Sequence, residues 1–134
     1  MTSHLREAVL AAQDRKALDL SVLDLEGASS LTSYFLICTG TSTRHTQAIC
    51  DGIIERLKKS GHAPSHVEGY TQAEWILIDY LNFIVHIFSE RARHFYDLER
   101  LWKNAPRLTV KDGDKDWDSG IGSSGHRVIG SSSD

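Results

Sequence analysis

The sequence predicts a mixed α/β (α+β) fold in which helices flank a single β-sheet, and three stretches carry this prediction. The run "TSYFLICTG" is apolar at consecutive positions and ends at Gly40, as expected of a strand covered on both faces. The segment "EWILIDYLNFIVHIF" reads as two apolar strands that meet at a short polar break. Between these stretches, Ile49, Ile53 and Leu57 follow helical spacing, so strands and helices share one core.

The first thirty residues are expected to hold a helix and a strand. Leu5, Val9 and Ala12 keep helical spacing behind a cap at Thr2 or Ser3, which predicts a short amphipathic helix. The segment "ALDLSVLDL" alternates apolar and polar positions and then changes phase. This pattern indicates a strand with one solvated face and leaves room for a bulge.

The middle of the chain is expected to hold a central strand followed by a helix. The strand is the apolar run "YFLIC", and the helix is expected to run from Ser42 or Thr43 to Ser60. Gly61 stands where a left-handed residue usually ends a helix. The following segment, "HAPSHVEGY", is expected to be a connection with one short strand.

A hairpin is expected next, with arms at Trp75–Asp79 and Phe83–Phe88 joined through Tyr80, Leu81 and Asn82.

The chain is then expected to end in a helix and a polar tail. The helix should run from about Arg91 to Lys103, with Phe95, Leu98 and Trp102 on one face. After Val110, Gly, Ser and Asp dominate, and such a segment buries too little apolar surface to offset the entropy of ordering it. Residues 1–110 are therefore predicted to form one domain, and residues 111–134 a disordered, dispensable tail.

Composition argues against nucleic acid and membrane partners. The chain has 18 acidic and 15 basic residues, a net charge of −3, which is not the basic footprint of a DNA-binding protein. No apolar run is long enough to span a membrane, and the N-terminus lacks the pattern of a signal peptide, so a cytoplasmic protein is expected. Cys38 and Cys50 are expected to be free buried thiols rather than a disulfide.

The loop "CTGTSTRH" is the first candidate for chemistry. Its free amides could meet an anion, but one glycine without a lysine is a poor phosphate loop, and a helix cap at Ser42 or Thr43 is favoured. Gly followed by Ser after a strand is also typical of nucleotidyltransferase sites. Those sites need two carboxylates one residue apart on a strand to hold magnesium ions, and no such pair follows Gly40 within reach.

Histidines are the second candidate. His86 could act as a general base oriented by Asp79, but the sequence offers no nucleophile beside it, so a structural or interface histidine is favoured. Of the seven histidines, His62 and His66 are the closest pair, and they flank Pro64 in a connection rather than one helix face. Neither a metal nor a cofactor is therefore expected.

Aromatic residues around the hairpin are the remaining signal. Trp75 opens one arm and Tyr80 closes it, so both are predicted to stand at the edges of the hairpin as exposed anchors of a protein interface. Burial in the core is the alternative for each of them.

Five motifs in order, "ICTGTSTRHTQAI", "VEGY", "EWILIDY", "IVHIF" and "RHFYDLERLW", resemble the ribosomal silencing factor family, also called the Iojap family. The resemblance covers roughly residues 5–104. It implies an α/β domain similar to the nucleotidyltransferase fold but without its catalytic carboxylates, and hence no enzyme.

The resemblance also implies a partner. Members of the family bind the large ribosomal subunit through a basic protein of its joining face, ribosomal protein fourteen of that subunit, block the small subunit and repress translation when nutrients are scarce. The family's partner-binding surface maps onto the hairpin and its approach, at Glu68, Gly69, Trp75, Asp79, Tyr80, Asn82 and His86. One departure concerns the turn, where the family typically has Gly-Asp and this chain has Leu81-Asn82. Because Leu81 resists positive φ, the turn is expected to be rebuilt around Asn82.

Two other functions stay open from the sequence. One is assembly of the large subunit, and the other is nucleotide binding at Gly40, Ser42 and Asp79. A homodimer in the absence of the ribosome is also expected, because an exposed aromatic hairpin could pair with itself.

Overall fold

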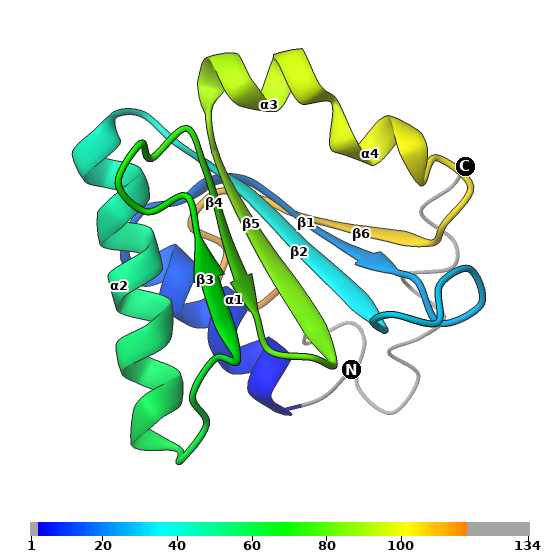
Figure 1. Ribbon diagram of the computed structural model, residues 1–134, viewed down its shortest axis with the longest axis horizontal. Coiled ribbons are helices and arrows are strands. Elements are labelled where there is room, and N and C mark those ends of the chain that lie inside the picture. Colours follow the sequence, from blue (N-terminus) through cyan, green and yellow to red (C-terminus); the bar gives the residue numbers. More distant parts are fainter. Residues whose placement is uncertain (1–2, 118–134) are drawn as a thin grey trace.

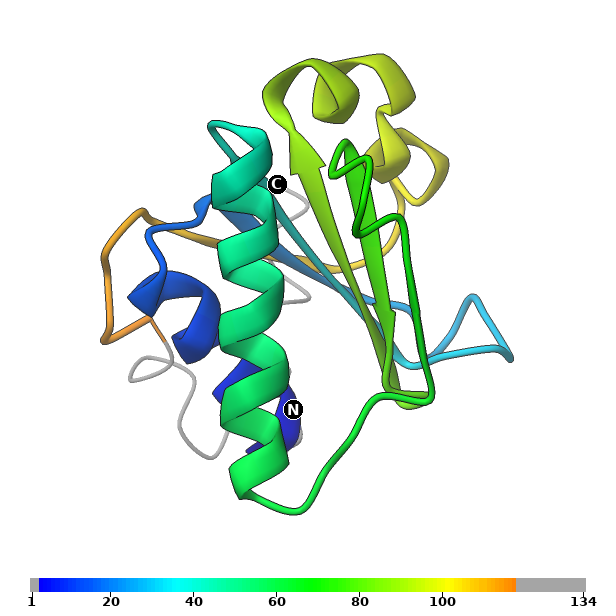
Figure 2. The same ribbon diagram turned by 60° about the vertical axis from the view of Figure 1, so that its left-hand side comes forward.

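The computed structural model of the protein describes residues 3–117, which form one mixed six-stranded sheet with helices on both faces (Figure 1). The strand order is β3-β4-β5-β2-β1-β6. In chain order the elements are α1 (Ser3–Asp14), β1 (Leu18–Asp24), β2 (Tyr34–Gly40), α2 (Thr43–Lys59), β3 (His66–Glu68), β4 (Trp75–Asp79), β5 (Phe83–Ser89), α3 (Glu90–Tyr96), α4 (Leu98–Leu101) and β6 (Arg107–Val110). Figure 2 shows α1 and α2 on one side of the sheet and α3 and α4 on the other. The predicted fold class is confirmed.

The centre of the sheet is the parallel pair β2 and β5, flanked on both sides by antiparallel strands. Every residue of β2 is buried, as the consecutive apolar run "YFLIC" predicted. The two hairpin arms form β4 and β5, and β3 pairs with β4 at the sheet edge. The predictions of a central strand, a hairpin and a short strand before it are therefore confirmed.

Helix α2 begins and ends as the sequence predicted. The Ser42 side chain accepts a hydrogen bond from the backbone N–H of His45 and caps the first turn. Gly61, with φ +76°, lies just beyond the last turn in the left-handed region that glycine adopts without strain.

Strand β1 has the expected irregularity but not the expected solvated face. Its register against β2 shifts between Leu18 and Ser21, and Asp19 there has φ +50°. Leu20, Ser21, Val22 and Leu23 are nevertheless all buried. The prediction of a wet face is wrong, because the partly buried Glu99 carboxylate of α4 accepts a hydrogen bond from Ser21 on the second side of the sheet.

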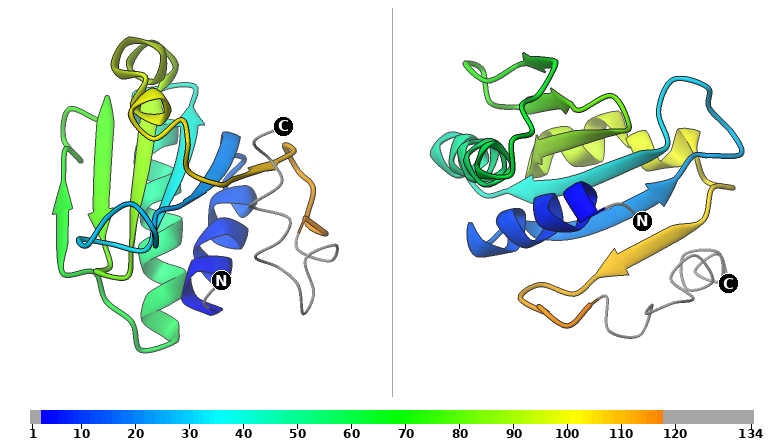
Figure 3. Two further views of the ribbon diagram at one scale, coloured as in Figure 1. Left: turned by 90° about the vertical axis from the view of Figure 1, so that its right-hand side faces the viewer. Right: turned by 90° about the horizontal axis from the view of Figure 1, so that it is seen from below.

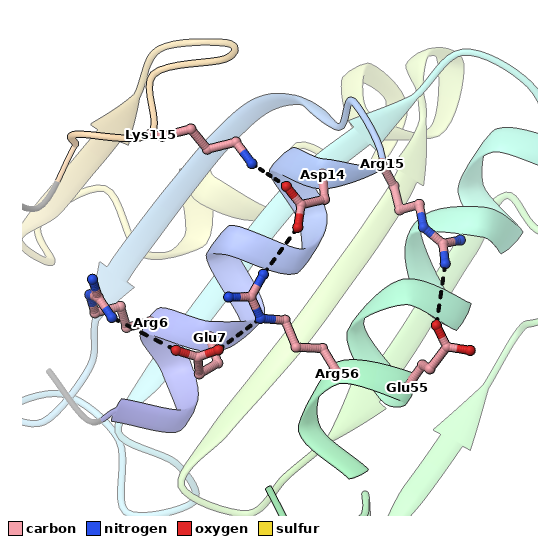
Figure 4. Close-up of polar contacts among 7 residues, drawn as sticks. All are labelled: Arg6, Glu7, Asp14, Arg15, Glu55, Arg56 and Lys115. Atoms are coloured by element: carbon pink, nitrogen blue, oxygen red, sulfur yellow. Dashed lines mark hydrogen bonds and ion pairs between the residues drawn. The ribbon is translucent and has the colours of Figure 1, made fainter. Parts of the chain in front are cut away.

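Ion pairs at the surface tie α1 to α2 (Figure 4). The Arg56 guanidinium donates to Glu7 at 2.7 Å and to Asp14 at 3.0 Å, so one side chain on α2 bridges two carboxylates on α1. Lys115 also contacts Asp14, and Arg15 lies 3.7 Å from Glu55. Exposed pairs of this kind stabilise a fold by only about 0–1 kcal/mol each, so apolar packing holds this layer.

The segment predicted as one helix from Arg91 to Lys103 is two short helices. Asp97 adopts a left-handed conformation, φ 46° and ψ 50°, which ends α3 and starts α4. Of the three residues predicted on the packed face, Leu98 and Trp102 pack against the second core cluster, but Phe95 is 74% exposed. The break at Asp97 rotates α4 relative to α3, so a single helical period no longer describes both.

A partly buried ionic network connects α3 and α4 to the sheet. The Arg93 guanidinium donates two hydrogen bonds to Glu99, at 2.9 and 3.1 Å, and a third to the Thr39 hydroxyl at 2.8 Å. The Ser21 hydroxyl donates to the same Glu99 carboxylate at 2.9 Å. Strands β1 and β2 are thereby connected to both helices across the break at Asp97.

The chain after α4 adds an edge strand and further contacts to the domain. Residues 107–110 form edge strand β6 against β1, which the sequence analysis did not predict. Trp117 is only 8% exposed and belongs to the first core cluster, and the Gln13 side chain donates to the Asp114 carbonyl at 2.6 Å. Residues 111–117 thus lie against the domain, and residues 118–134 of the predicted tail lie outside the described residues.

Both cysteines are free and buried, as predicted. Burial raises the pKa of the Cys38 and Cys50 thiols to about 12, which makes them poor nucleophiles.

Candidate protein-binding surface

The second face of the sheet is covered only in part. Helix α3 contacts β5 and β2, and in Figure 1 no helix of the described residues stands in front of the lower halves of β3, β4 and β5. The sheet register places five side chains on this face, in the uncovered region and at its border with α3, and we call this surface the open face: Glu68, Trp75, Leu77, Asp79 and Ile84. Trp75, Leu77, Asp79 and Ile84 are partly exposed, and Glu68 is exposed.

Trp75 is half-buried at the boundary between the open face and α3. Its ring centroid lies 4.9 Å from that of Phe88 and 4.8 Å from that of Tyr96. Its indole Nε1–H donates to Nδ1 of His86 at 3.0 Å. The residue packs against the second core cluster and stays partly exposed, so Trp75 is neither fully buried nor fully exposed.

His86 lies beneath the open face rather than on it. The side chain is 4% exposed, and burial lowers its pKa to about 4, so the imidazole is neutral at physiological pH. The disfavoured alternative, a general base oriented by Asp79, is contradicted, because Nδ1 accepts from Trp75 and Asp79 pairs with Ile84, two residues before His86. The favoured interpretation of a hydrogen-bonded structural histidine agrees with this contact. A buried imidazole cannot contact a partner directly, so the prediction of His86 as a contact residue needs correction.

Tyr80 points to the other face of the sheet. It is 2% exposed, stacks on Phe83 at 5.0 Å and on His62 at 5.2 Å, and burial raises its pKa to about 12. The prediction of Tyr80 as an exposed anchor is therefore wrong. The physical reason is strand alternation, which places Tyr80 on the side of Ile78, toward α1 and α2.

The hairpin turn centres on Leu81, not on Asn82. Leu81 adopts φ +70°, and the N–H of Asn82 donates to the Tyr80 carbonyl at 2.8 Å, the bond of a three-residue γ-turn. The Asp79 carboxylate accepts from the Leu81 N–H at 2.7 Å and holds this conformation. The expected rebuilding around Asn82 is wrong, because Asp79 stabilises positive φ at the residue that resists it. Asn82 is exposed beside the open face.

The approach to β4 depends on Gly69. Gly69 has φ +80°, and a Cβ there would lie 2.1 Å from the Trp75 carbonyl oxygen, so any side chain would displace the start of β4. Glu68 is exposed next to it and contacts His66. Gly69 therefore sets the backbone geometry at the start of β4, and Glu68 places a carboxylate beside it.

The alternative nucleotide site is not assembled. Gly40 pairs with Ser89 at one end of β5, and Asp79 pairs with Ile84 near the other end. Five residues of strand separate the two pairs, about 16 Å at the usual rise. Gly40 and Asp79 thus cannot meet one ligand phosphate. Within residues 3–117, no group of three or more His, Cys, Asp or Glu residues is placed to hold a metal ion.

Sequence reasoning missed Leu77, Ile84 and Tyr96 as surface residues. For Leu77 and Ile84 the signal was the pattern within "WILID" and "FIVHIF", where both sets of alternating positions are mostly apolar. That pattern is typical of a strand covered on both faces, and only the extent of α3 and α4 shows that part of one face is uncovered.

No helix of the described residues is long and apolar enough to cross a membrane.

Comparison with known proteins gives a consistent family assignment. The family model described as "RsfS: Ribosomal silencing factor during starvation" matches residues 1–126. A Bacillus subtilis (strain 168) protein named ribosomal silencing factor RsfS is 39% identical over 104 residues, which cover 78% of this chain and 88% of that protein. A crystal structure of a Chromobacterium violaceum protein superposes with a TM-score of 0.72 and 31% identity over 74% of this chain and 82% of that one. A mouse protein named mitochondrial assembly of ribosomal large subunit protein 1 is 29% identical and covers 67% of this chain and 41% of its own length.

Proposed function

This chain belongs to the ribosomal silencing factor family, and we propose that its open face binds the large ribosomal subunit and keeps the small subunit from joining it. The proposed contact is ribosomal protein fourteen of the large subunit, the basic protein that the family resemblance indicates. The proposed role is non-catalytic and cytoplasmic, and it lowers translation when nutrients are scarce.

The observation that carries this proposal is the composition of the open face. Trp75, Leu77 and Ile84 form a half-buried apolar centre, with the carboxylates of Glu68 and Asp79 at its rim. Specific protein interfaces have this anatomy, an apolar core inside a polar rim, with aromatic residues enriched in the core. Acidic rim residues complement a basic partner, which favours fast association and correct register.

The way the open face is built also supports binding. Its side chains project from paired strands rather than from loops, and β4 is hydrogen-bonded to neighbours on both sides. A surface that is already ordered loses less conformational entropy on binding. The open face is therefore suited to a partner that meets it as a preformed surface.

Sedimentation of purified ribosomal subunits tests the silencing role. Small and large subunits are mixed with and without saturating protein, and we expect the protein to sediment with the large subunit and to lower the yield of joined ribosomes. Joined ribosomes at an unchanged yield, with the protein bound, would overturn the blocking role but not the binding.

A pair of Leu→Lys variants tests the location of the surface. Leu77→Lys places a like charge against the basic partner at the apolar centre, and we expect it to cost about 2 kcal/mol or more of binding free energy. Leu101→Lys is the matched control, because Leu101 is 77% exposed on α4 outside the open face. An equal loss of affinity in both variants would show that the open face is not the site.

Assembly of the large subunit is the second candidate function. It is favoured by the similarity to the mouse protein whose name refers to that process. Accumulation of large-subunit precursors in a deletion strain would support it. Because both roles use the same contact in this proposal, Leu77→Lys should fail to complement either defect.

A nucleotide-binding function and a free homodimer have direct tests. Calorimetry with nucleoside triphosphates and magnesium is expected to show no specific binding, since Gly40 and Asp79 lie at opposite ends of β5. Light scattering of the free protein over a concentration range tests the dimer, which we propose to form through the open face. Leu77→Lys should then shift the mass toward the monomer.

A further inference from the structure

His86 is surrounded by aromatic rings directly under the open face. Its ring centroid lies 4.4 Å from that of Phe35, 5.9 Å from Trp75 and 6.3 Å from Phe88. The side chain is 4% exposed, and its strand neighbours across the sheet are Leu77 on β4 and Ile37 on β2. The site is apolar, so a hydrophobic residue would pack there without a polar atom to satisfy.

The two nitrogens of His86 have different environments. Nδ1 accepts a hydrogen bond from the Trp75 indole, which assigns the proton of the neutral ring to Nε2. Nε2 is buried and has no hydrogen-bond partner among the described residues. A buried N–H without a partner destabilises the folded state, so the imidazole is not explained by the stability of the core.

The Nδ1 acceptor has one evident effect, which is on Trp75. Phe88 and Tyr96 contact the indole ring. Ring-to-ring contacts are only weakly directional, so by themselves they do not fix the orientation of the indole. The bond to His86 removes this freedom, because the indole has a single donor and the acceptor is held by a rigid strand. The indole of this partly exposed residue therefore has one orientation before any partner binds.

We propose that His86 is a positioning residue that fixes the Trp75 indole in the orientation required for binding the ribosomal partner. This inference rests on the proposed function of the open face. His86 itself does not touch the partner, and the unpaired Nε2 is retained because Nδ1 is needed.

Two substitutions separate positioning from packing. His86→Leu removes the acceptor and fills the apolar site, and we expect its melting temperature to be equal to or higher than that of the wild type. Its dissociation constant for purified large subunits should rise about three- to tenfold, the cost of immobilising one large side chain on binding. His86→Asn keeps an acceptor at the position of Nδ1, and it should restore most of the affinity although it packs less well.

The indole N–H resonance of Trp75 gives a readout that packing alone does not move. In the ¹⁵N–¹H spectrum, assigned with Trp75→Phe, the Trp75 signal of His86→Leu should shift upfield and exchange with water faster than in the wild type. His86→Asn should reverse both changes. The indole signals of Trp102 and Trp117 serve as internal controls, because neither side chain bonds to His86.

The outcomes distinguish this inference from the proposed function. If wild-type protein does not bind large subunits, the proposed function fails, and the indole spectra alone then decide whether His86 orients Trp75. If wild type binds and His86→Leu binds equally well, or if its Trp75 signal is unchanged, the positioning role is overturned. A melting temperature that falls in parallel with affinity, without recovery in His86→Asn, would also overturn it by assigning His86 to the core.

Discussion

The two faces of the sheet are made from the same strands but are covered to different extents. On the face toward α1 and α2, Ile76, Ile78, Val85 and Ile87 are fully buried in one continuous cluster. On the other face, α3 and α4 cover only part of the sheet, as Figure 3 shows from two further directions. The side chains beyond them, such as Leu77, stay partly exposed although they are equally apolar. The difference agrees with the proposal that a partner covers the part of the second face that residues 3–117 leave open.

Neighbouring residues on β4 allow the most direct test of this comparison. Ile76 and Leu77 point to opposite faces of the sheet. Because Ile76 is fully buried, Ile76→Ala leaves a closed cavity and should lower the free energy of unfolding by about 2–5 kcal/mol. Leu77→Ala should cost less than about 1 kcal/mol, since water can reach the vacated space. Urea unfolding measures both midpoints. Equal costs would show that the open face is packed as tightly as the closed one.

The end of the described chain gives a second test on the closed face. Truncation after Val110 removes Trp117 from the first core cluster together with the contacts of Gln13 and Asp14, and we expect a loss of about 2–4 kcal/mol of stability. Truncation after Trp117 is the matched control and should keep the stability of the full chain. If both truncations melt at the temperature of the full chain, Trp117 is not part of the core, and the sequence-based boundary at residue 110 stands.

The Arg93–Glu99 network under α3 and α4 allows a test on the second face of the sheet. Arg93→Met leaves the Glu99 carboxylate with only the Ser21 hydroxyl as a hydrogen-bond donor among its described contacts, and we expect it to cost about 2–3 kcal/mol. Because α3 supports Trp75 through Tyr96, affinity for large subunits should fall as well. Arg91→Met is the matched control, because the Arg91 side chain is 82% exposed. The difference between the denaturant midpoints of the two variants measures the stabilisation that is specific to the network. Equal midpoints for the two variants would contradict a stabilising network.

The same network predicts a pH dependence. Burial alone would raise the pKa of Glu99, but the hydrogen bonds and charge of Arg93 and the bond from Ser21 outweigh it, so the pKa is lowered. A carboxyl whose pKa is lower in the folded state stabilises the fold above its unfolded-state pKa, and that stabilisation is lost as the pH falls through the folded-state pKa. Urea midpoints measured from neutral to acidic pH should therefore fall more steeply for the wild type than for Glu99→Gln. Parallel curves would show that Glu99 titrates as it does in the unfolded chain.

The elements that the sequence predicted well have local signals. The cap at Ser42, the left-handed Gly61 and the apolar run of β2 each depend on residues close in sequence. The break at Asp97 and the strand β6 were missed, because Asp97 is held by contacts of Arg93 and Glu99 with the sheet, and β6 exists only where β1 offers an edge. Long-range contacts of this kind leave little trace in local periodicity.

The sequence placed some of the candidate residues correctly on the sheet and misplaced others. Trp75, Asp79 and Glu68 do lie on one face of the hairpin region, as their spacing allowed. Tyr80 was misplaced because a change of one residue along a strand moves a side chain to the opposite face of the sheet. His86 was misplaced because the sequence gives no sign that an imidazole in an apolar strand is buried. Leu77 and Ile84 looked like core residues, since their exposure depends on where α3 and α4 stop.

The hairpin turn joins the two faces and gives the smallest expected effect. Leu81 has φ +70° with its side chain 65% exposed, so it bears the strain of a left-handed conformation while burying little apolar surface. Leu81→Gly should remove this strain and stabilise the protein by about 0.5–1 kcal/mol in urea unfolding, because glycine adopts positive φ freely. Asn82→Gly is the matched control, and it should give no gain because Asn82 does not have positive φ. A gain from Asn82→Gly instead would mean that Asn82 bears the strain, as the sequence alone suggested. A gain from Leu81→Gly with unchanged affinity for large subunits would place the partner's contacts on the strands of the open face rather than on the turn.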